Sequence, residues 1–413
     1  MSQGSRRAIE ALRAGVPNRD AVQEMGTDQP AIEHRFHQTL GQVAGTALGG
    51  GQLPGMVVAG DFGSGKSHLL EYLQHLALDQ RFACSKVVIS KEAPLGQPHQ
   101  LYRTAVHSLR LPRGIGGLDA LVLQLDKRSG PYAAAARRIA TDDASFDPLF
   151  QASFRVWEEV NDPPIMENMV SFWRGERLRI QDLRDAVRRT GIQIPVKARK
   201  VSELAIPRFR FMAELVAAAG LQGWVILLDE VELLATFSLQ ARANSYRTLA
   251  TLLGLTGDTL PGIFTVATVT TDLETEVFHK RQDQEKIPIK FAERLGDIMA
   301  DIQAGIESLQ ASSPGRATLE PVSQQKLQEA HEKARHLYTE AYGWAPPPAE
   351  VSQRESSARM RQYVRAWITR WDLMRLFPGY SPEIETANYV PDLSERQGLD
   401  RSDEPDQEDI DRE

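Results

Sequence analysis

Residues 56–78 read MVVAGDFGSGKSHLLEYLQHLAL, a short apolar segment joined to an amphipathic one by a glycine-rich turn. The four residues 56–59 have the composition of a buried strand. The leucines between residues 69 and 76 recur at the spacing of one helix face. We therefore predict a strand, a tight loop and a helix, and we expect the rest of the chain to be organised around this unit.

The loop between the two segments matches the pattern G-x-x-x-x-G-K-[ST]. Its glycines allow a backbone path that a Cβ would block, so that successive N–H groups can point at a phosphate. Lys66 supplies a charge for the β- and γ-phosphates, and the Ser67 hydroxyl can bind Mg²⁺. The helix N-terminus favours the same anion. We predict ATP and Mg²⁺ as cofactors. The predicted binding residues are Gly60, Asp61, Phe62, Gly63, Ser64, Gly65, Lys66, Ser67 and His68.

A second motif, GWVILLDEVELLATF, occupies residues 223–237. Its apolar run predicts a strand buried on both faces, which ends in Asp229 and Glu230. An acid at the first position can hold Mg²⁺, and its neighbour can orient and deprotonate an attacking water. Together with the phosphate loop, the motif predicts magnesium-dependent NTP hydrolysis. Nucleotide binding without turnover is the alternative, and a P-loop kinase is disfavoured because no second substrate pocket is apparent.

The pattern after this motif resembles P-loop ATPases of the AAA+ type. Residues 262–269 predict a fourth strand, and in AAA+ proteins a polar residue on this strand helps to place the water. We assign that role to Thr270, with Thr268 as the second choice. Arg281 then precedes the segment IPIKF, residues 287–291, which we predict to be the fifth strand. The resemblance implies that Arg281 is a catalytic finger reaching a neighbouring subunit, hence a homo-oligomer.

The length and composition of the chain limit the number of domains and the class of protein. With 413 residues, of which 42% are hydrophobic, the chain can bury a large core in two or three domains. Its single cysteine, Cys84, excludes an internal disulfide. No signal peptide or long apolar run is apparent, which predicts a cytoplasmic protein without a membrane partner. The predicted fold class is α/β: a P-loop NTPase, AAA+/ASCE-like, with a parallel sheet, a large helical insertion and a C-terminal helical lid.

The predicted domains follow from this pattern. Residues 1–50 are helices packing on the core, which either contact the adenine ring or are only structural. Residues 51–291 form the ATPase core, with a helical insertion at about 110–200. Residues 292–378 form the lid, in which Arg359 and Arg361 are candidate phosphate contacts. Residues 379–413 form a disordered acidic tail. Positions 381–413 carry a charge of −9 and the remainder of the chain carries +2, which together give the net charge of −7.

Basic side chains recur within the predicted insertion. Solvated helix faces explain most such runs, and a surface that faces nucleic acid is the sharper alternative. The residues concerned are Arg174, Arg177, Arg179, Arg184, Arg188, Arg189, Lys197, Arg199 and Lys200.

Several blocks resemble the BREX-system ATP-binding proteins, the BrxC/BrxD-type P-loop ATPases of bacterial phage-defence systems. They are RRAIEALRAGVPN, GDFGSGKSHLLEYLQHLAL, KVVISKE, LLDEVELL, AYGWAPP and RMRQYVRAWI, and the resemblance covers nearly the whole chain except the acidic tail. It implies an ATPase that acts on DNA or on partner complexes, together with methyltransferase, helicase or phosphatase-like components. A nucleotide-dependent switch or scaffold with negligible turnover is the rival interpretation.

Overall fold

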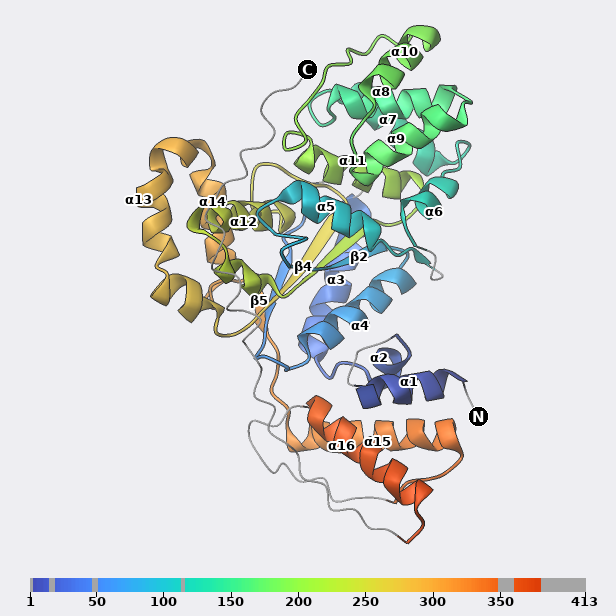
Figure 1. Ribbon diagram of the computed structural model, residues 1–413, viewed down its shortest axis with the longest axis vertical. Helices are drawn as coiled ribbons and strands as arrows, with labels where there is room; N and C mark the ends of the chain where they lie inside the picture. The colour runs from blue at the N-terminus through green and yellow to red at the C-terminus, as the bar shows by residue number, and fades with distance from the viewer. Residues whose placement is uncertain (1–2, 15–18, 47–50, 113–115, 348–359, 380–413) are drawn as a thin grey trace.

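The centre of the protein is a parallel sheet of five strands in the order β2-β3-β4-β1-β5 (Figure 1). The computed structural model describes residues 3–14, 19–46, 51–112, 116–347 and 360–379. The strands are β1 (Met56–Ala59), β2 (Ala83–Val88), β3 (Trp224–Asp229), β4 (Ile263–Val269) and β5 (Arg316–Thr318). Because all strands run in one direction, their carboxyl ends lie along a single edge of the sheet, and the loops that follow them meet there.

The strand β1 shows why this sheet is buried on both faces. Met56 and Val58 pack into one apolar cluster, with helices α3 (Pro30–Thr46) and α4 (Lys66–Asp79). Val57 and Ala59 pack into a second cluster on the opposite face. Successive side chains of a strand point to opposite faces, so an uninterrupted apolar run fits a sheet covered by helices on both sides.

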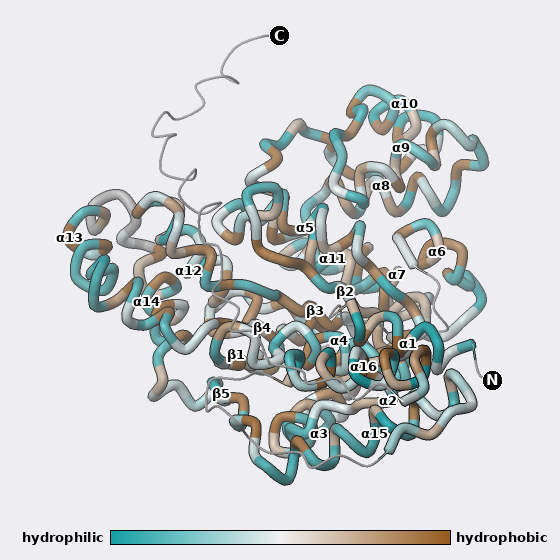
Figure 2. Tube along the Cα trace, turned by 60° about the horizontal axis from the view of Figure 1, so that its bottom comes forward, coloured by the Kyte–Doolittle hydropathy of each residue, from teal (hydrophilic) through white to brown (hydrophobic). Residues whose placement is uncertain are grey.

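The connection from β2 to β3 is mostly helical among the residues that the structure describes there, as predicted. Its helices pack into the same apolar cluster as one face of the sheet. In Figure 2, hydrophilic colour runs along α10 at the outside of the molecule. The helices are α5 (Pro98–His107), α6 (Leu118–Leu123), α7 (Gly130–Thr141), α8 (Pro148–Glu159), α9 (Pro163–Arg174), α10 (Ile180–Thr190) and α11 (Ala205–Ala218).

The predicted fifth strand is wrong. The segment 287–291 lies inside helix α13 (Asp283–Leu295). Ile287 and Phe291 are buried one helical turn apart, whereas Ile289 between them is 83% exposed. The alternating pattern of these residues fits a strand equally well, but the buried pair has the i, i+4 spacing of a helix. The fifth strand is instead β5, which pairs with β1.

The remaining elements complete the chain between β3 and the C-terminal helices. Helices α12 and α14 pack against each other beside the sheet, and α13 lies at the outside (Figures 1 and 2). These elements are η2 (Val231–Thr236), α12 (Leu239–Leu252), η3 (Thr275–Lys280), η4 (Gly296–Ile298), α14 (Met299–Ser308), α15 (Gln324–Tyr342) and α16 (Met360–Leu376).

The two ends of the described chain form one helical unit, which we call the terminal bundle. It consists of α1 (Gln3–Ala14), α2 (Arg19–Met25), α15 and α16, which lie together below the sheet in Figure 1. Ile9, Leu337 and Trp371 share an apolar cluster distinct from the two clusters of the sheet. At its edge, Arg13 forms an ion pair with Asp372 at 2.9 Å. The first helices of the chain are therefore divided, with α1 and α2 in the bundle and α3 on the sheet.

Of the described helices, none is both long and apolar enough to span a membrane. Cys84 is buried on β2, and burial raises the pKa of its thiol. The predicted acidic tail lies outside the described residues, apart from position 379.

Candidate nucleotide-binding site

The glycine-rich loop connects the carboxyl end of β1 to the first residue of α4, as predicted. Gly63 and Gly65 have φ values of +76° and +101°, a region in which other residues are strained. A Cβ on Gly60 would lie 2.5 Å from Ser64 Oγ and 2.7 Å from Leu319 Cδ1. The loop therefore needs glycine at positions 63 and 65 for backbone conformation, whereas a larger residue at position 60 would displace the Ser64 and Leu319 side chains.

The N-terminus of α4 leaves donors for an anion. Gly65 is the N-cap residue and provides no side-chain cap. The first N–H groups of a helix have no intrahelical acceptor, so those of the first turn of α4 are directed along the helix axis toward the loop. Together with the helix dipole, they make this end of α4 suited to phosphate.

Lys66 is a buried cation beside this loop. The side chain donates hydrogen bonds from Nζ to the carbonyl oxygens of Gly60, at 3.0 Å, and Asp61, at 3.2 Å. Its Nζ also lies 3.9 Å from Glu232 Oε1. Burial lowers the pKa of Lys66, and the carboxylates around it, Glu232 first, oppose that shift. A phosphate at this position would likewise favour the charged lysine.

Asp229 ends β3 at the edge of the sheet, near the glycine-rich loop. Its carboxylate is buried, and Oδ1 accepts hydrogen bonds from Thr268 Oγ1, at 2.8 Å, and from the Glu230 N–H, at 3.1 Å. These two donors hold one oxygen and fix the plane of the carboxylate. Asp229 and Ser67 both line the cavity beside the loop, so an acid and a hydroxyl suited to Mg²⁺ are present on the same cavity.

The two threonine candidates on the β4 side occupy different positions. Thr268 is fully buried within β4 and contacts Asp229 through its hydroxyl. Thr270 follows the end of β4 and is half-buried, and its carbonyl accepts from the Leu273 N–H. The structure thus brings the second choice, and not the first, into contact with the acidic strand. The adjacent Thr271 donates from its hydroxyl to Asp61 of the loop.

Two glutamates, Glu230 and Glu232, follow Asp229, and only Glu230 is a predicted site residue. Glu230 is exposed, has a left-handed backbone with φ 58°, and lines the cavity. Glu232 also lines it, and burial raises the pKa of its carboxyl. A signal for Glu232 exists in the sequence, because a short helical turn after the strand can bring the last acid of DEVE back to the loop.

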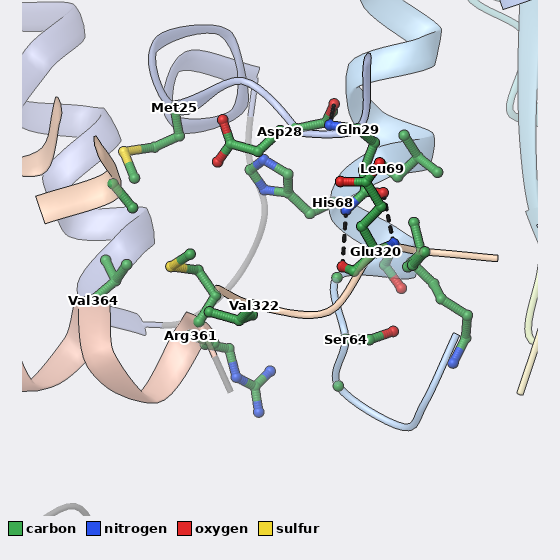
Figure 3. Close-up of a pocket in the computed structure, with 18 of the residues that line it drawn as sticks. Met25, Asp28, Gln29, Ser64, His68, Leu69, Glu320, Val322, Arg361 and Val364 are labelled. Carbon is green, nitrogen blue, oxygen red and sulfur yellow. Dashed lines mark hydrogen bonds between the residues drawn. The ribbon is translucent and has the colours of Figure 1, made fainter. Parts of the chain in front are cut away.

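A cavity of about 360 Å³ extends from the phosphate loop to the terminal bundle (Figure 3). At the bundle end, Met25 of α2 and Val364 of α16 project toward each other, with Val322 nearby. Arg361, in the first turn of α16, lines the same cavity, whereas Arg359 lies outside the described residues. The cavity thus has a polar end at the loop and an apolar end at the bundle.

The segment between α2 and α3 forms hydrogen bonds with residues on both sides of this cavity. His68 Nε2 lies 2.7 Å from the Gly26 carbonyl oxygen, and burial lowers the pKa of His68, so a neutral ring donates this hydrogen bond. The Gln29 side chain accepts from the Glu320 N–H, at 2.9 Å, and donates to the Glu320 carbonyl, at 3.3 Å (Figure 3). Lys333 of α15 donates to the Met25 carbonyl at 2.8 Å.

Arg281 is set apart from these residues. It follows the last residue of η3 and is exposed, and it is absent from the described residues that line the cavity. Its predicted role requires a neighbouring copy of the chain. Among the described residues, no group of three or more His, Cys, Asp or Glu side chains is arranged to hold a metal by itself. That is compatible with Mg²⁺ in a nucleotide site, where phosphate and water oxygens complete the ligands.

A protein-family model matches most of the chain. The model of the BREX system ATP-binding proteins BrxC/D matches residues 2–147 and 153–369. The matched residues include the glycine-rich loop, the acidic strand, helices α1, α2 and α15, and the first part of α16. A comparison with curated proteins finds no match for the chain. The family match covers most of the sequence, and the chain therefore belongs to the family of BREX system ATP-binding proteins BrxC/D.

Proposed function

We propose that the protein is a magnesium-dependent ATPase with an AAA+-like core that acts in BREX defence. One observation carries this proposal: Lys66 and Ser67 of the loop line the same cavity as Asp229 and Glu230, which lie some 160 residues later in the chain. The cavity therefore unites a phosphate-binding loop, an acid suited to Mg²⁺ and an acid suited to water. Binding alone would need only the first two.

The order of the strands supports the AAA+-like assignment. Strand β4 lies between β1, which leads into the phosphate loop, and β3, which carries Asp229. A polar residue on such a strand can reach both motifs, as AAA+ proteins require. Thr268 contacts Asp229 and Thr271 contacts Asp61, so side chains from β4 and from the loop after it bridge the two motifs.

Each residue has a proposed part in hydrolysis. Lys66 and the N–H groups at the start of α4 bind the β- and γ-phosphates and stabilise charge on their oxygens. Ser67 and Asp229 would hold Mg²⁺, which when bound neutralises charge on the same oxygens. Glu230 accepts a proton from the attacking water, and its exposed position gives access to that water. Thr270 remains a candidate for orienting the water, and Thr268 positions Asp229.

The bundle end of the cavity is our proposed site for the nucleoside. Met25, Val322 and Val364 provide apolar surface for a flat base, and Asp28 and Gln29 add polar groups near it (Figure 3). Because these residues come from α2, the connection to α15, and α16, a bound nucleotide would contact the sheet and the terminal bundle together. ATP would thereby bias the bundle's position, which is a route for coupling to partners.

Membership of a BREX family implies other components of that system as partners. We propose that methyltransferase, helicase or phosphatase-like components, and DNA, are what the ATP cycle acts on. The rival is a switch or scaffold with negligible turnover.

Steady-state ATPase assays separate the two. We expect wild-type protein with Mg²⁺ to release phosphate, and Glu230→Gln to bind ATP normally but hydrolyse it at least about 100-fold more slowly, as for loss of a general base. Glu285→Gln removes an exposed carboxylate on α13, away from the cavity, and serves as the matched control. Equal rates for wild type and Glu230→Gln would refute the assignment of Glu230. A wild type that binds ATP without turnover would favour the switch.

A further inference from the structure

We propose that Glu232 competes with the phosphates of the nucleotide for Lys66, and so holds nucleotide affinity below what the loop alone would give. The inference rests on the proposed function, because it concerns the same cavity. It assigns a role to an acid that the hydrolysis scheme does not use.

The position of Glu232 is unusual for a buried acid. It lies in the first turn of η2, and its side chain is 13% exposed. Oε1 lies 3.9 Å from Lys66 Nζ. Oε2 is buried without a hydrogen-bond partner among the described residues. A carboxylate buried for stability is ordinarily satisfied by donors, because leaving an oxygen unpaired is costly. We therefore attribute Glu232 to the chemistry of the site, where its nearest cation is Lys66.

Lys66 does not depend on Glu232 for its position. Two carbonyl oxygens, of Gly60 and Asp61, already accept hydrogen bonds from Nζ at 3.0 and 3.2 Å. The ion pair with Glu232 is longer than either of these contacts. The main effect of Glu232 on the site is therefore its negative charge, and not the positioning of the Lys66 side chain.

The negative charges around Lys66 explain why Glu232 should weaken phosphate binding. Four carboxylates interact with the charge of Lys66, and the strongest of these interactions is with Glu232; the other three are Asp61, Asp229 and Glu230. Among the described residues, Glu232 is also the one acid within ion-pair distance of Nζ. A phosphate that contacts Lys66 must either displace this carboxylate or lie beside it. Both alternatives weaken binding, the first by breaking the ion pair and the second by like-charge repulsion.

Glu230 and Glu232 consequently have opposite expected effects, although they are two positions apart. Glu230 is exposed and lines the cavity, and its removal should slow hydrolysis without changing affinity. Glu232 faces the lysine, and its removal should strengthen binding. Weaker phosphate binding would also favour release of ADP after hydrolysis, which repeated turnover of ATP requires.

The test measures ATP and ADP affinity by isothermal titration calorimetry on the full chain with Mg²⁺. ATP is titrated in the Glu230→Gln background to prevent turnover, with and without Glu232→Gln. The substitution keeps the shape of the side chain and removes its charge. We expect the dissociation constants of both nucleotides to fall at least about fivefold. Glu285→Gln, an exposed acid on α13, is the control for net charge and should leave both constants within about twofold.

Unchanged or weaker affinity in Glu232→Gln overturns the proposal. If that variant fails to fold, as judged by thermal melting, Glu232→Asp replaces it. The shorter side chain draws the carboxylate away from Lys66, so the expected change has the same direction and a smaller size. A wild type that binds no ATP defeats the proposed function itself. A wild type that binds and hydrolyses ATP, beside a Glu232→Gln variant that binds no more tightly, defeats this inference alone.

Discussion

Thr268 Oγ1 donates a 2.8 Å hydrogen bond to Asp229 Oδ1, and both residues are buried at the edge of the sheet. The two strands pair in register up to Leu228 and Ala267, so the next residue of each strand lies beside the other. The acid proposed to bind Mg²⁺ is thus oriented by the neighbouring strand before any ligand arrives, which reduces the reorganisation that binding requires.

Thr268→Val should disrupt this orientation with little change in shape. One donor to a buried carboxylate is lost, which should lower the free energy of unfolding by about 1–3 kcal/mol. It should also raise the Mg²⁺ concentration needed for half-maximal ATPase activity. Thermal melting and a Mg²⁺ titration of phosphate release measure the two effects. Thr270→Val is the paired variant, and a larger loss of Mg²⁺ response in it than in Thr268→Val would contradict the structural assignment.

Lys66→Ala should abolish ATP binding, because the loop loses its one cation. A charge-assisted contact with phosphate contributes more than about 1 kcal/mol, so the affinity should fall by more than about fivefold even if the loop N–H groups still bind. Calorimetry measures it directly. Affinity within about twofold of wild type would be the opposing result. The fold should persist, since burial already disfavours the charged lysine at this position.

Ile9→Ala should reveal that the terminal bundle is one cooperative unit. Ile9 is fully buried against C-terminal helices, so the cavity left should lower the free energy of unfolding by about 2–5 kcal/mol. Hydrogen exchange should then quicken in α15 and α16, more than 300 residues away in sequence, and ATP affinity should fall because α2 and α16 line the cavity. Gln328→Ala, exposed on α15, is the control. Faster exchange confined to α1 would contradict a shared unit.

Arg281→Ala tests the predicted finger. If Arg281 reaches the nucleotide of a neighbouring copy, the ATPase rate per subunit should rise with protein concentration, and the variant should lose that rise while still binding ATP. An arginine finger contributes about 10³-fold or more in rate. Phosphate release across a concentration series, alongside mass measurement with and without ATP, gives the answer. A concentration-independent rate with a fully active variant would remove the role in trans.

The acidic strand and the glycine-rich loop were predictable because the residues that define each motif are consecutive in the sequence. The run 224–228 ends in Asp229 in the sequence as it does in β3, and the loop needs its glycines for reasons local to its backbone. Helices between β2 and β3 were likewise predictable from their apolar spacing. The family also follows from these blocks and from those at the two ends of the chain.

Only the tertiary structure decided which distant residues meet. Strand β5, with the sequence Arg-Ala-Thr, has no apolar pattern and is defined by its backbone pairing with β1. The more apolar segment 287–291 is helical instead, because its buried residues lie one turn apart on α13, which packs against α12 and α14. The contact of Thr268 with Asp229 depends on strand order and register. The union of α1 and α2 with α15 and α16, and the approach of Glu232 to Lys66, join elements separated by long stretches of chain. Local propensity and periodicity carry no information about such pairings, because these are set by how the buried faces of whole elements fit together.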